Sequence, residues 1–429
     1  MRESDEAVRN LEAAVATVRN RLIPLLFLLY IVAYLDRINV GFASLQMNQA
    51  LGFSDATYGL GAGIFFVGYT LFEIPSNVIL ARVGARLWIA RIMITWGLVS
   101  AGMMFVRGAP AFYILRFLLG LAEAGFFPGI IFYLTRWVPA RERARTIAAF
   151  MTATLVAGVI GGPLSGALLT LQGTGGLAGW QWLFLLEGLP AVVLGVVVLR
   201  VMTERPEQAS WLPSAQKAAL VARIGDEQRL ARDQVHSTGA ALRHPRLWLL
   251  SAVYFTVPVA LYAFGFFLPQ IIQGSFRGST FQIGLLSAIP YIAGSIAMVI
   301  AGRHSDSTGE RRWHVAVAAI VSAVGFVASA FATSLTMSIV TLSIAMVGLA
   351  SMFGPFWTLA TSFVNGVGAA AGIALINSIG NIGGFVGPYL LGSIKTLTAS
   401  FAAGLVLIGL TVACGGALAL AVPDDSVSR

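Results

Sequence analysis

Long apolar runs separated by short polar segments dominate this sequence. A helix needs roughly 20 apolar residues to cross the hydrocarbon core of a bilayer. Charged residues make up only 11% of the chain, less than half of the roughly 25% typical of soluble domains. The sequence therefore predicts an all-α polytopic membrane protein with 12 transmembrane helices. The twelve runs are 22–42, 57–80, 88–106, 111–136, 145–171, 181–201, 246–273, 280–302, 314–332, 336–364, 368–391 and 400–422.

Positive charges are distributed unevenly between the segments that join these runs. If the N-terminus is cytoplasmic, 23 of the 28 Lys and Arg residues lie in cytoplasmic segments, and only Arg107, Arg277 and Lys395 lie outside. Because positive residues keep loops in the cytoplasm, this pattern predicts that both termini are cytoplasmic in a multi-pass protein of the cell inner membrane. The net charge of +9 is then a topology signal. The expected surroundings are a lipid bilayer, and no nucleic-acid partner is expected.

The chain divides into two halves of near-equal length. A polar stretch separates six runs in the first half from six in the second, and within it Ser214–Leu230 has the pattern of an amphipathic helix that begins after Pro213. Such a duplication predicts two six-helix bundles with a substrate site between them near mid-membrane. The predicted parts are a cytoplasmic N-terminal segment 1–21, a bundle 22–201, a cytoplasmic linker 202–245, a bundle 246–422 and a cytoplasmic tail 423–429.

Two loops contain related motifs. The spacing of Gly84 and Arg86 after the second run equals that of Gly309 and Arg311 after the eighth. The second copy resembles the Gly-x-x-x-Asp-Arg-x-Gly-x-Arg loop of the major facilitator superfamily, and this resemblance implies the fold of that family and a gating role for the motif. The first copy departs from it, with Ala81 at the position of the acid. The matching residues of the second copy are Gly302, Asp306, Gly309, Arg311 and Arg312.

Further motifs cover essentially the whole chain and are similar to those of the anion:cation symporter family, which includes bacterial tartrate, phthalate, glucarate and galactonate transporters. The resemblance implies proton-coupled transport of an organic acid, with proton sites at Asp36 and Glu123 and anion-binding arginines at Arg37 and Arg116. The blocks that carry it are Tyr34–Asn39, Glu73–Asn77, Arg116–Gly129, Trp182–Gly188, Gly354–Trp357 and Asn377–Asn381.

Ionisable residues are rare inside the predicted helices, and all lie in the first half. A charge at the bilayer centre costs ~2.5–3.5 kcal/mol on insertion scales, so each retained charge needs a reason. A guanidinium binds a carboxylate bidentately, which favours Arg37 and Arg116 as ligands of an anionic solute. Asp36 and Glu123 are candidate proton carriers, because burial and a nearby arginine control carboxyl protonation. The alternative is a buried salt bridge that merely joins the first and fourth helices, formed either by Asp36 with Arg116 or by Glu123 with an arginine.

Two further acids are interpreted as structural. Glu73 and Glu187 precede the helix-disturbing residues Pro75 and Gly188 near the cytoplasmic halves of their helices. We expect these acids to pair with loop arginines or free backbone amides.

The second half has no charge within its predicted helices, so it contributes neutral groups. Asn377 and Asn381 are spaced i, i+4 and share a helix face. Their amides suit the oxygens of a solute, although hydrogen bonding between helices is an equally ordinary use. The predicted cavity walls, for which core packing is the alternative, are Tyr34, Tyr69, Tyr254, Tyr262, Trp357 and Thr358.

These observations favour a secondary active transporter that takes up a small organic anion with protons by alternating access. Sugar acids, dicarboxylates and aromatic carboxylates all suit the candidate residues. The alternative is an exporter or antiporter, because Gly162 and Pro163 lie in a glycine-rich run that resembles the antiporter motif of the superfamily. Histidine pairs, cysteine clusters and phosphate loops are missing from the predicted helices, so neither an enzyme, a metal site nor a cofactor besides the proton is expected. Superfamily precedent implies a functional monomer.

Overall fold

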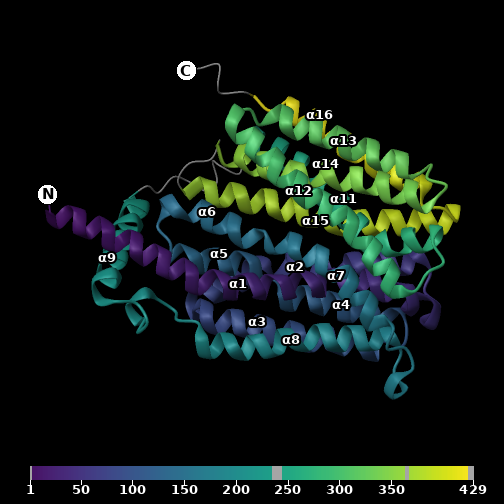
Figure 1. The fold of residues 1–429 in the computed structure, drawn as a ribbon, viewed down its shortest axis with the longest axis horizontal. Helices are drawn as coiled ribbons and strands as arrows, with labels where there is room; N and C mark the ends of the chain where they lie inside the picture. The colour runs from purple at the N-terminus through teal and green to yellow at the C-terminus, as the bar shows by residue number, and fades with distance from the viewer. Residues whose placement is uncertain (1, 234–243, 363–366, 424–429) are drawn as a thin grey trace.

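A computed structural model describes residues 2–233, 244–362 and 367–423, and these residues form helices and loops without strands. The long helices run side by side along one axis (Figure 1). In the described part, 11 helices are long and apolar enough to cross a membrane, and Val156–Leu169 is a shorter apolar helix. Parts of the predicted linker and tail, 234–243 and 424–429, lie outside the described residues.

The first half departs from the predicted runs at two places. The run 111–136 is divided between α4 and α5, and the run 145–171 between α6 and α7. The first division occurs at Gly125, whose φ of 87° is left-handed and whose missing Cβ would lie 2.3 Å from Ser76 Oγ. Glycine permits both the turn and this close approach. The helices are α1 (Arg2–Leu51), α2 (Asp55–Val83), α3 (Ala85–Gly102), α4 (Ala109–Glu123), α5 (Phe126–Thr135), α6 (Ala140–Met151), α7 (Ala153–Leu169) and α8 (Gly179–Val201), with 3₁₀ turns at Met103–Phe105, Thr174–Gly176 and Pro206–Gln208.

Helix α1 is 50 residues long and begins well before the first apolar run. Its polar beginning is covered by α9 (Ser214–Asp233), which starts at the residue that the sequence indicates. Val18 of α1 and Leu220 of α9 are fully buried, and Arg21 lies 5.0 Å from the ring centroid of Trp211. The predicted boundary at residue 22 therefore marks a change of polarity within one continuous helix, since helical hydrogen bonding does not depend on side-chain polarity.

The second half contains six long helices and lies beside the first (Figure 1). Both termini and α9 are at one end of the molecule, which we call the terminal end, and the opposite end is the distal end. The helices are α11 (Pro245–Ser275), α12 (Thr280–Thr308), α13 (Arg312–Ser329), α14 (Leu335–Ser362), α15 (Val367–Thr398) and α16 (Ala402–Leu420).

Glycines bring the halves into close contact toward the distal end. A Cβ on Gly59 of α2 would lie 2.5 Å from the Pro388 carbonyl oxygen of α15, and one on Gly162 of α7 would lie 2.4 Å from the Gly284 carbonyl oxygen of α12. Small residues permit such close backbone contact between membrane helices. Lys395 Nζ adds an ion pair with Asp55 Oδ1 across the same interface at 3.0 Å.

We expect Gly162→Ala to destabilise this arrangement by about 1–3 kcal/mol, the usual range for overpacking a well-packed interface. The reason is the contact of the new Cβ with the Gly284 carbonyl. A lower midpoint of thermal unfolding in detergent would show it. Gly274→Ala in α11 is the matched control, because nothing lies within 4 Å of its added Cβ. Equal midpoints for the two variants would contradict the prediction.

Candidate functional site

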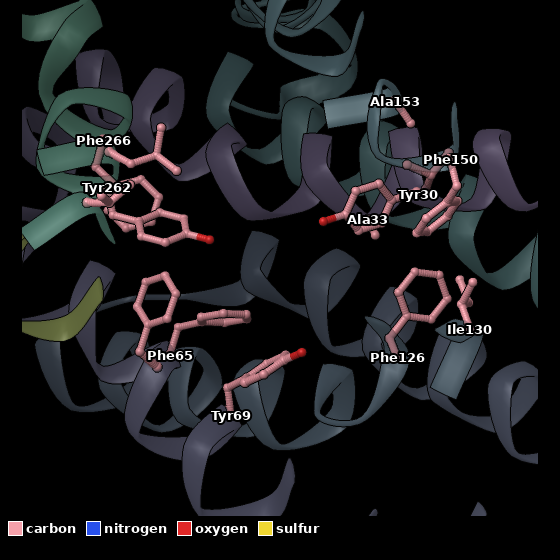
Figure 2. Packing of buried hydrophobic residues seen from close by; sticks show 14 of the residues in the cluster. Tyr30, Ala33, Phe65, Tyr69, Phe126, Ile130, Phe150, Ala153, Tyr262 and Phe266 are labelled. Carbon is pink, nitrogen blue, oxygen red and sulfur yellow. The ribbon is translucent and has the colours of Figure 1, made fainter. Parts of the chain in front are cut away.

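Arg37 of α1 lies where the two halves meet. Its Nη2 donates to Glu123 Oε1 at the end of α4, forming an ion pair, and its Nη1 donates to the Tyr262 hydroxyl of α11 at 3.1 Å. The guanidinium lies 5.4 Å from the Phe65 ring centroid and 5.5 Å from that of Tyr69. Figure 2 shows Tyr262 and Phe266 of α11 facing Phe65 and Tyr69 of α2. The site therefore combines a cation, an acid and aromatic walls from both halves.

Arg116 of α4 is completely buried beside this site. Its Nε and Nη2 donate to the carbonyl oxygens of Gly61 and Ala62 on α2, at 3.3 and 3.1 Å. The Phe65 ring centroid is 5.2 Å away. Among the described residues its buried Nη1 has no hydrogen-bond partner. Backbone carbonyls thus hold Arg116 while one donor stays available for an anion.

Asp36 precedes Arg37 in the chain but has different neighbours. Its carboxylate accepts hydrogen bonds from Trp96 Nε1 and Ser100 Oγ of α3, both at 2.7 Å. Successive residues of a helix point about 100° apart, so Asp36 and Arg37 lie on different faces of α1. Of the two alternative salt bridges, the one between Asp36 and Arg116 is not formed, because α3 supplies the donors. The other is formed, since Glu123 of α4 pairs with Arg37 of α1.

Glu73 of α2 is held by the second half. Asn377 Nδ2 donates to its Oε1 at 3.1 Å, and Asn381 Nδ2 to its Oε2 at 3.4 Å. The expected pairing of Glu73 with loop arginines or backbone amides was therefore wrong. The two amides share a helix face, as predicted, but in this structure they face a carboxylate of the protein. They join α2 to α15 between the Arg37 site and the terminal end.

The remaining aromatic candidates are divided between two places. Tyr34 packs with Leu35 and Ile38 in a small buried cluster. Tyr254 meets Trp357 edge-on with ring centroids 4.9 Å apart, and a Cβ on Gly380 would lie 2.5 Å from the Tyr254 ring. Tyr254 and Trp357 therefore lie beside the part of α15 that contains Asn377 and Asn381.

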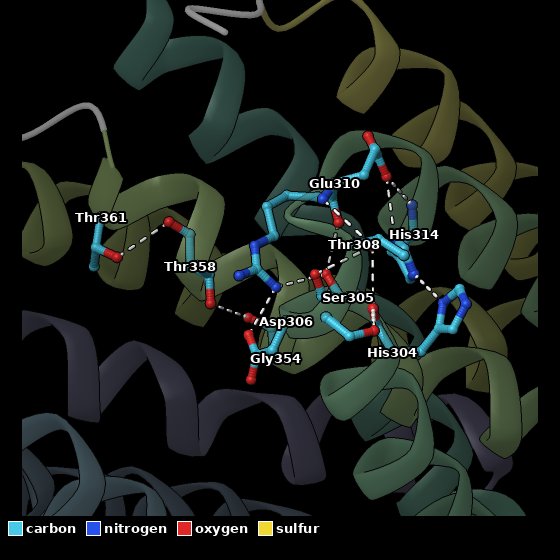
Figure 3. Close-up of polar contacts among 11 residues, drawn as sticks. His304, Ser305, Asp306, Thr308, Glu310, His314, Gly354, Thr358 and Thr361 are labelled. Carbon is cyan, nitrogen blue, oxygen red and sulfur yellow. Dashed lines mark hydrogen bonds and ion pairs between the residues drawn. The ribbon is translucent and has the colours of Figure 1, made fainter.

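Thr358 is exposed on α14, and its hydroxyl donates to the Gly354 carbonyl of its own helix at 3.0 Å (Figure 3). It is not brought to the Arg37 site.

The loop between α12 and α13 is ordered by its own charges (Figure 3). Arg311 Nη1 pairs with Asp306 Oδ1 at 2.8 Å and donates to Ser305 Oγ at 2.8 Å. Gly309 ends α12 with a left-handed φ of 70°. Partial burial raises the pKa of the Glu310 carboxyl, but hydrogen bonds from the Trp313 amide and from His314 outweigh this and hold that pKa below its usual range. Arg312 donates to the Leu420 carbonyl oxygen of α16. The motif thus fixes the loop and ties it to α16.

The corresponding first loop obtains its acid from elsewhere. Glu204, just after α8, accepts hydrogen bonds from the backbone amides of Ala85 and Arg86 at 2.9 Å each. It also pairs with Arg136 Nη1 at 2.6 Å. A carboxylate at a helix N-terminus satisfies free N–H groups and the helix dipole. Glu204 therefore supplies an acid to the loop whose motif has Ala81 at the acidic position. The sequence did not reveal it, because Glu204 lies more than a hundred residues after that motif. The sequence signal that could have indicated it is an acidic residue directly after the sixth apolar run.

A family comparison decides what kind of protein carries this site. The model of the Major Facilitator Superfamily matches residues 26–388. This chain belongs to the major facilitator superfamily. It is therefore a membrane transporter and not an enzyme, and its all-helical structure has the fold of that superfamily.

Individual proteins agree with this membership. A protein of Agrobacterium vitis named "Putative tartrate transporter" is 52% identical over 95% of this chain and 91% of its own length. A "Quinolone resistance transporter" of Acinetobacter baumannii is 42% identical over 94% of this chain and 93% of its own. A crystal structure of a bacterial homolog of the human lysosomal transporter Spinster, inward-facing and unoccupied, has a TM-score of 0.80 at 18% identity and covers 94% of this chain and 97% of that chain. The last likeness concerns the fold alone.

We expect Glu204→Gln to destabilise the protein by about 0.5–2 kcal/mol, the usual cost of losing a helix N-cap. The amide removes the charge that faces Arg136 and the start of α3. Thermal unfolding of purified protein measures the effect. Glu207→Gln, three residues later and exposed, is the control and should leave the midpoint unchanged. Identical midpoints in both variants would show that Glu204 does not stabilise the loop.

Proposed function

We propose that this transporter imports a small organic anion together with protons across the inner membrane, as a monomer with both termini and the linker in the cytoplasm. The observation that carries the proposal is the ion pair of Arg37 with Glu123 at the interface of the halves. It contains a candidate anion ligand and a candidate proton acceptor in direct contact. The proton is the only coupling ion that the proposal requires.

The contact makes solute binding and protonation interdependent. While Glu123 is ionised it occupies Nη2 of Arg37. A proton on Glu123 removes this competing charge, and a solute carboxylate then binds the guanidinium with two parallel hydrogen bonds. The free Nη1 of Arg116 provides a second cationic donor close by. Solute and proton therefore bind together, which is the thermodynamic requirement of a symporter.

The second half supplies neutral recognition. The Tyr262 hydroxyl accepts a hydrogen bond from Arg37, and Asn377, Asn381 and Trp357 belong to the same half as Tyr262. Two arginines suit a solute with two anionic or polar ends, and amides suit hydroxyl groups. The relative named for tartrate, a hydroxylated dicarboxylate, fits this combination. We therefore favour hydroxylated mono- and dicarboxylates as the substrate class.

Uptake is the favoured direction because the pH gradient and the membrane voltage both act on the coupled proton. A charge that crosses 100 mV gains about 2.3 kcal/mol. A monoanion with one proton uses only the pH gradient, whereas two protons also use the voltage.

A drug exporter is the second candidate, since one relative is named for quinolone resistance. Gly162 and Gly166 support it weakly, because their close contacts with α12 serve packing in any alternating-access cycle. Expression in a drug-sensitive host tests this candidate: unchanged quinolone sensitivity contradicts it.

Solute-driven proton uptake into proteoliposomes tests the symport proposal. We expect wild type to take up protons when solute is added, and Glu123→Gln to lose this coupling while it still exchanges labelled solute for unlabelled solute. Glu207→Gln serves as the control with normal coupling. Normal proton uptake by Glu123→Gln would remove Glu123 from the mechanism.

Thermal-shift measurements against organic acids test the substrate class. Tartrate or a sugar acid at 100 times its Kd would stabilise the folded protein by about 2.7 kcal/mol, whereas benzoate at the same concentration, which has no hydroxyl group, should give a smaller shift. Arg116→Gln should lose the shift with an anion that stabilises wild type. A shift that survives in Arg116→Gln would contradict the role of its free donor.

A further inference from the structure

A second cluster of buried polar groups lies in the first half, on a different face of α1 from Arg37. It contains Asp36 and Asn39 of α1 and Glu187 of α8, whose exposed fractions are 1%, 1% and 4%. Asn39 Nδ2 donates to Asp36 Oδ1 at 3.3 Å, and the same side-chain amide also lies within reach of the Glu187 carboxyl group, as a weak donor toward it. One amide therefore stands between two carboxyl groups.

Cations are not what holds these two acids. Asp36 accepts from Trp96, Ser100 and Asn39, and Glu187 Oε1 accepts from Ser165 of α7 at 2.8 Å. Within the described residues, no Lys, Arg or His forms an ion pair with either carboxyl group. Two ionised carboxylates without a cation are very costly in a buried site. The cluster must therefore contain at least one proton.

Two unsatisfied oxygen atoms indicate where that proton lies. Glu187 Oε2 and Asn39 Oδ1 are both buried and lack a hydrogen-bond partner in the described part of the chain. Both atoms are acceptors while Glu187 is ionised, so neither can satisfy the other. A proton on Oε2 turns that oxygen into a donor toward Asn39. One proton then satisfies both atoms, which removes the cost of two buried unpaired polar groups.

The hydrogen bonds also distinguish the two acids. Asp36 accepts three hydrogen bonds, which stabilise its ionised form. Glu187 accepts one from Ser165, has only a weak contact with the Asn39 amide, and keeps Oε2 unsatisfied. We propose that Glu187 is a further proton-binding residue, which carries a proton on Oε2 and donates it to Asn39 Oδ1, and that Glu187, Asn39 and Asp36 form a proton site separate from Arg37 and Glu123.

The site is connected to the interface of the two halves. Ser165 is followed by Gly166, whose carbonyl oxygen accepts a hydrogen bond from Thr280 Oγ1 of α12 at 3.1 Å. Movement of α12 against α7 therefore displaces the donor of Glu187. Asp36 is a titratable member of the cluster. The other charged groups that act on it are Arg116 and Glu123 of α4. The nearest groups of α3 and α7 are uncharged. The link to transport rests on the proposed proton coupling, but the protonation of Glu187 does not.

Infrared difference spectroscopy of purified protein tests the protonation directly. We expect a carbonyl-stretch band of a protonated carboxylic acid in wild type that is lost in Glu187→Gln, because glutamine has the same shape and its amide can still donate to Asn39. Asn39→Leu, which removes the acceptor, should retain the band and move it to higher frequency. Glu207→Gln should leave it unchanged.

Two spectroscopic results would overturn the inference. One is an identical set of carboxylic-acid bands in wild type and Glu187→Gln. The other is loss of the Glu187 band on addition of sodium ions at constant pH, which would make the cluster a sodium site. The Asn39→Leu measurement keeps the test decisive if Glu187→Gln does not fold.

Transport assays separate this inference from the proposed function. In proteoliposomes, Glu187→Gln should retain counterflow and lose the dependence of solute accumulation on the pH gradient. An unchanged dependence in this variant, with coupled wild type, contradicts the inference alone. Wild type that shows no solute-driven proton uptake contradicts the proposed symport, while the infrared bands still decide whether Glu187 is protonated.

Discussion

The cost of placing charge in a lipid-embedded bundle governs this structure. Lipid tails offer no hydrogen bonds, so each buried ionisable group needs polar partners, and here the protein supplies them. Arg37 binds Glu123 and Tyr262, and Arg116 donates hydrogen bonds to backbone carbonyls. Glu73 accepts hydrogen bonds from two asparagine amides. Every one of these contacts joins different helices. The same groups that make the bundle chemically active therefore also determine how its helices pack.

Helix α1 is the centre of this arrangement, because neighbouring residues along it serve different surroundings. Asp36 binds residues of α3, and Arg37 binds residues of α4 and α11. Asn39 contacts Asp36 and Glu187. Around Arg37 and Glu73 the described charged groups come from the first half, and the second half contributes hydroxyl, amide and aromatic groups. Such a division suits alternating access, since one half can hold ions while the other moves over it.

The sequence predicted the helical runs well, and its errors have physical causes. A hydropathy run records polarity, whereas a helix ends where its hydrogen bonds end; α1 therefore continues through the polar residues before 22. The break at Gly125 depends on the approach of Ser76 from α2, which local sequence does not reveal. Glu204 was missed for the same reason, because the helix end that it caps precedes it by more than a hundred residues.

The sequence by itself determined the class of protein, its division into halves, and which side chains bring charge, amide or aromatic surface into the helices. These properties depend on composition and on helical periodicity, which are local. Only the tertiary structure decided the partners: Glu123 is 86 residues from Arg37, and Asn377 is 304 residues from Glu73. Periodicity fixes the face on which a side chain lies, but not the helix that packs against it. That choice placed the amides of Asn377 and Asn381 against Glu73, and gave Asp36 neutral donors in place of an arginine.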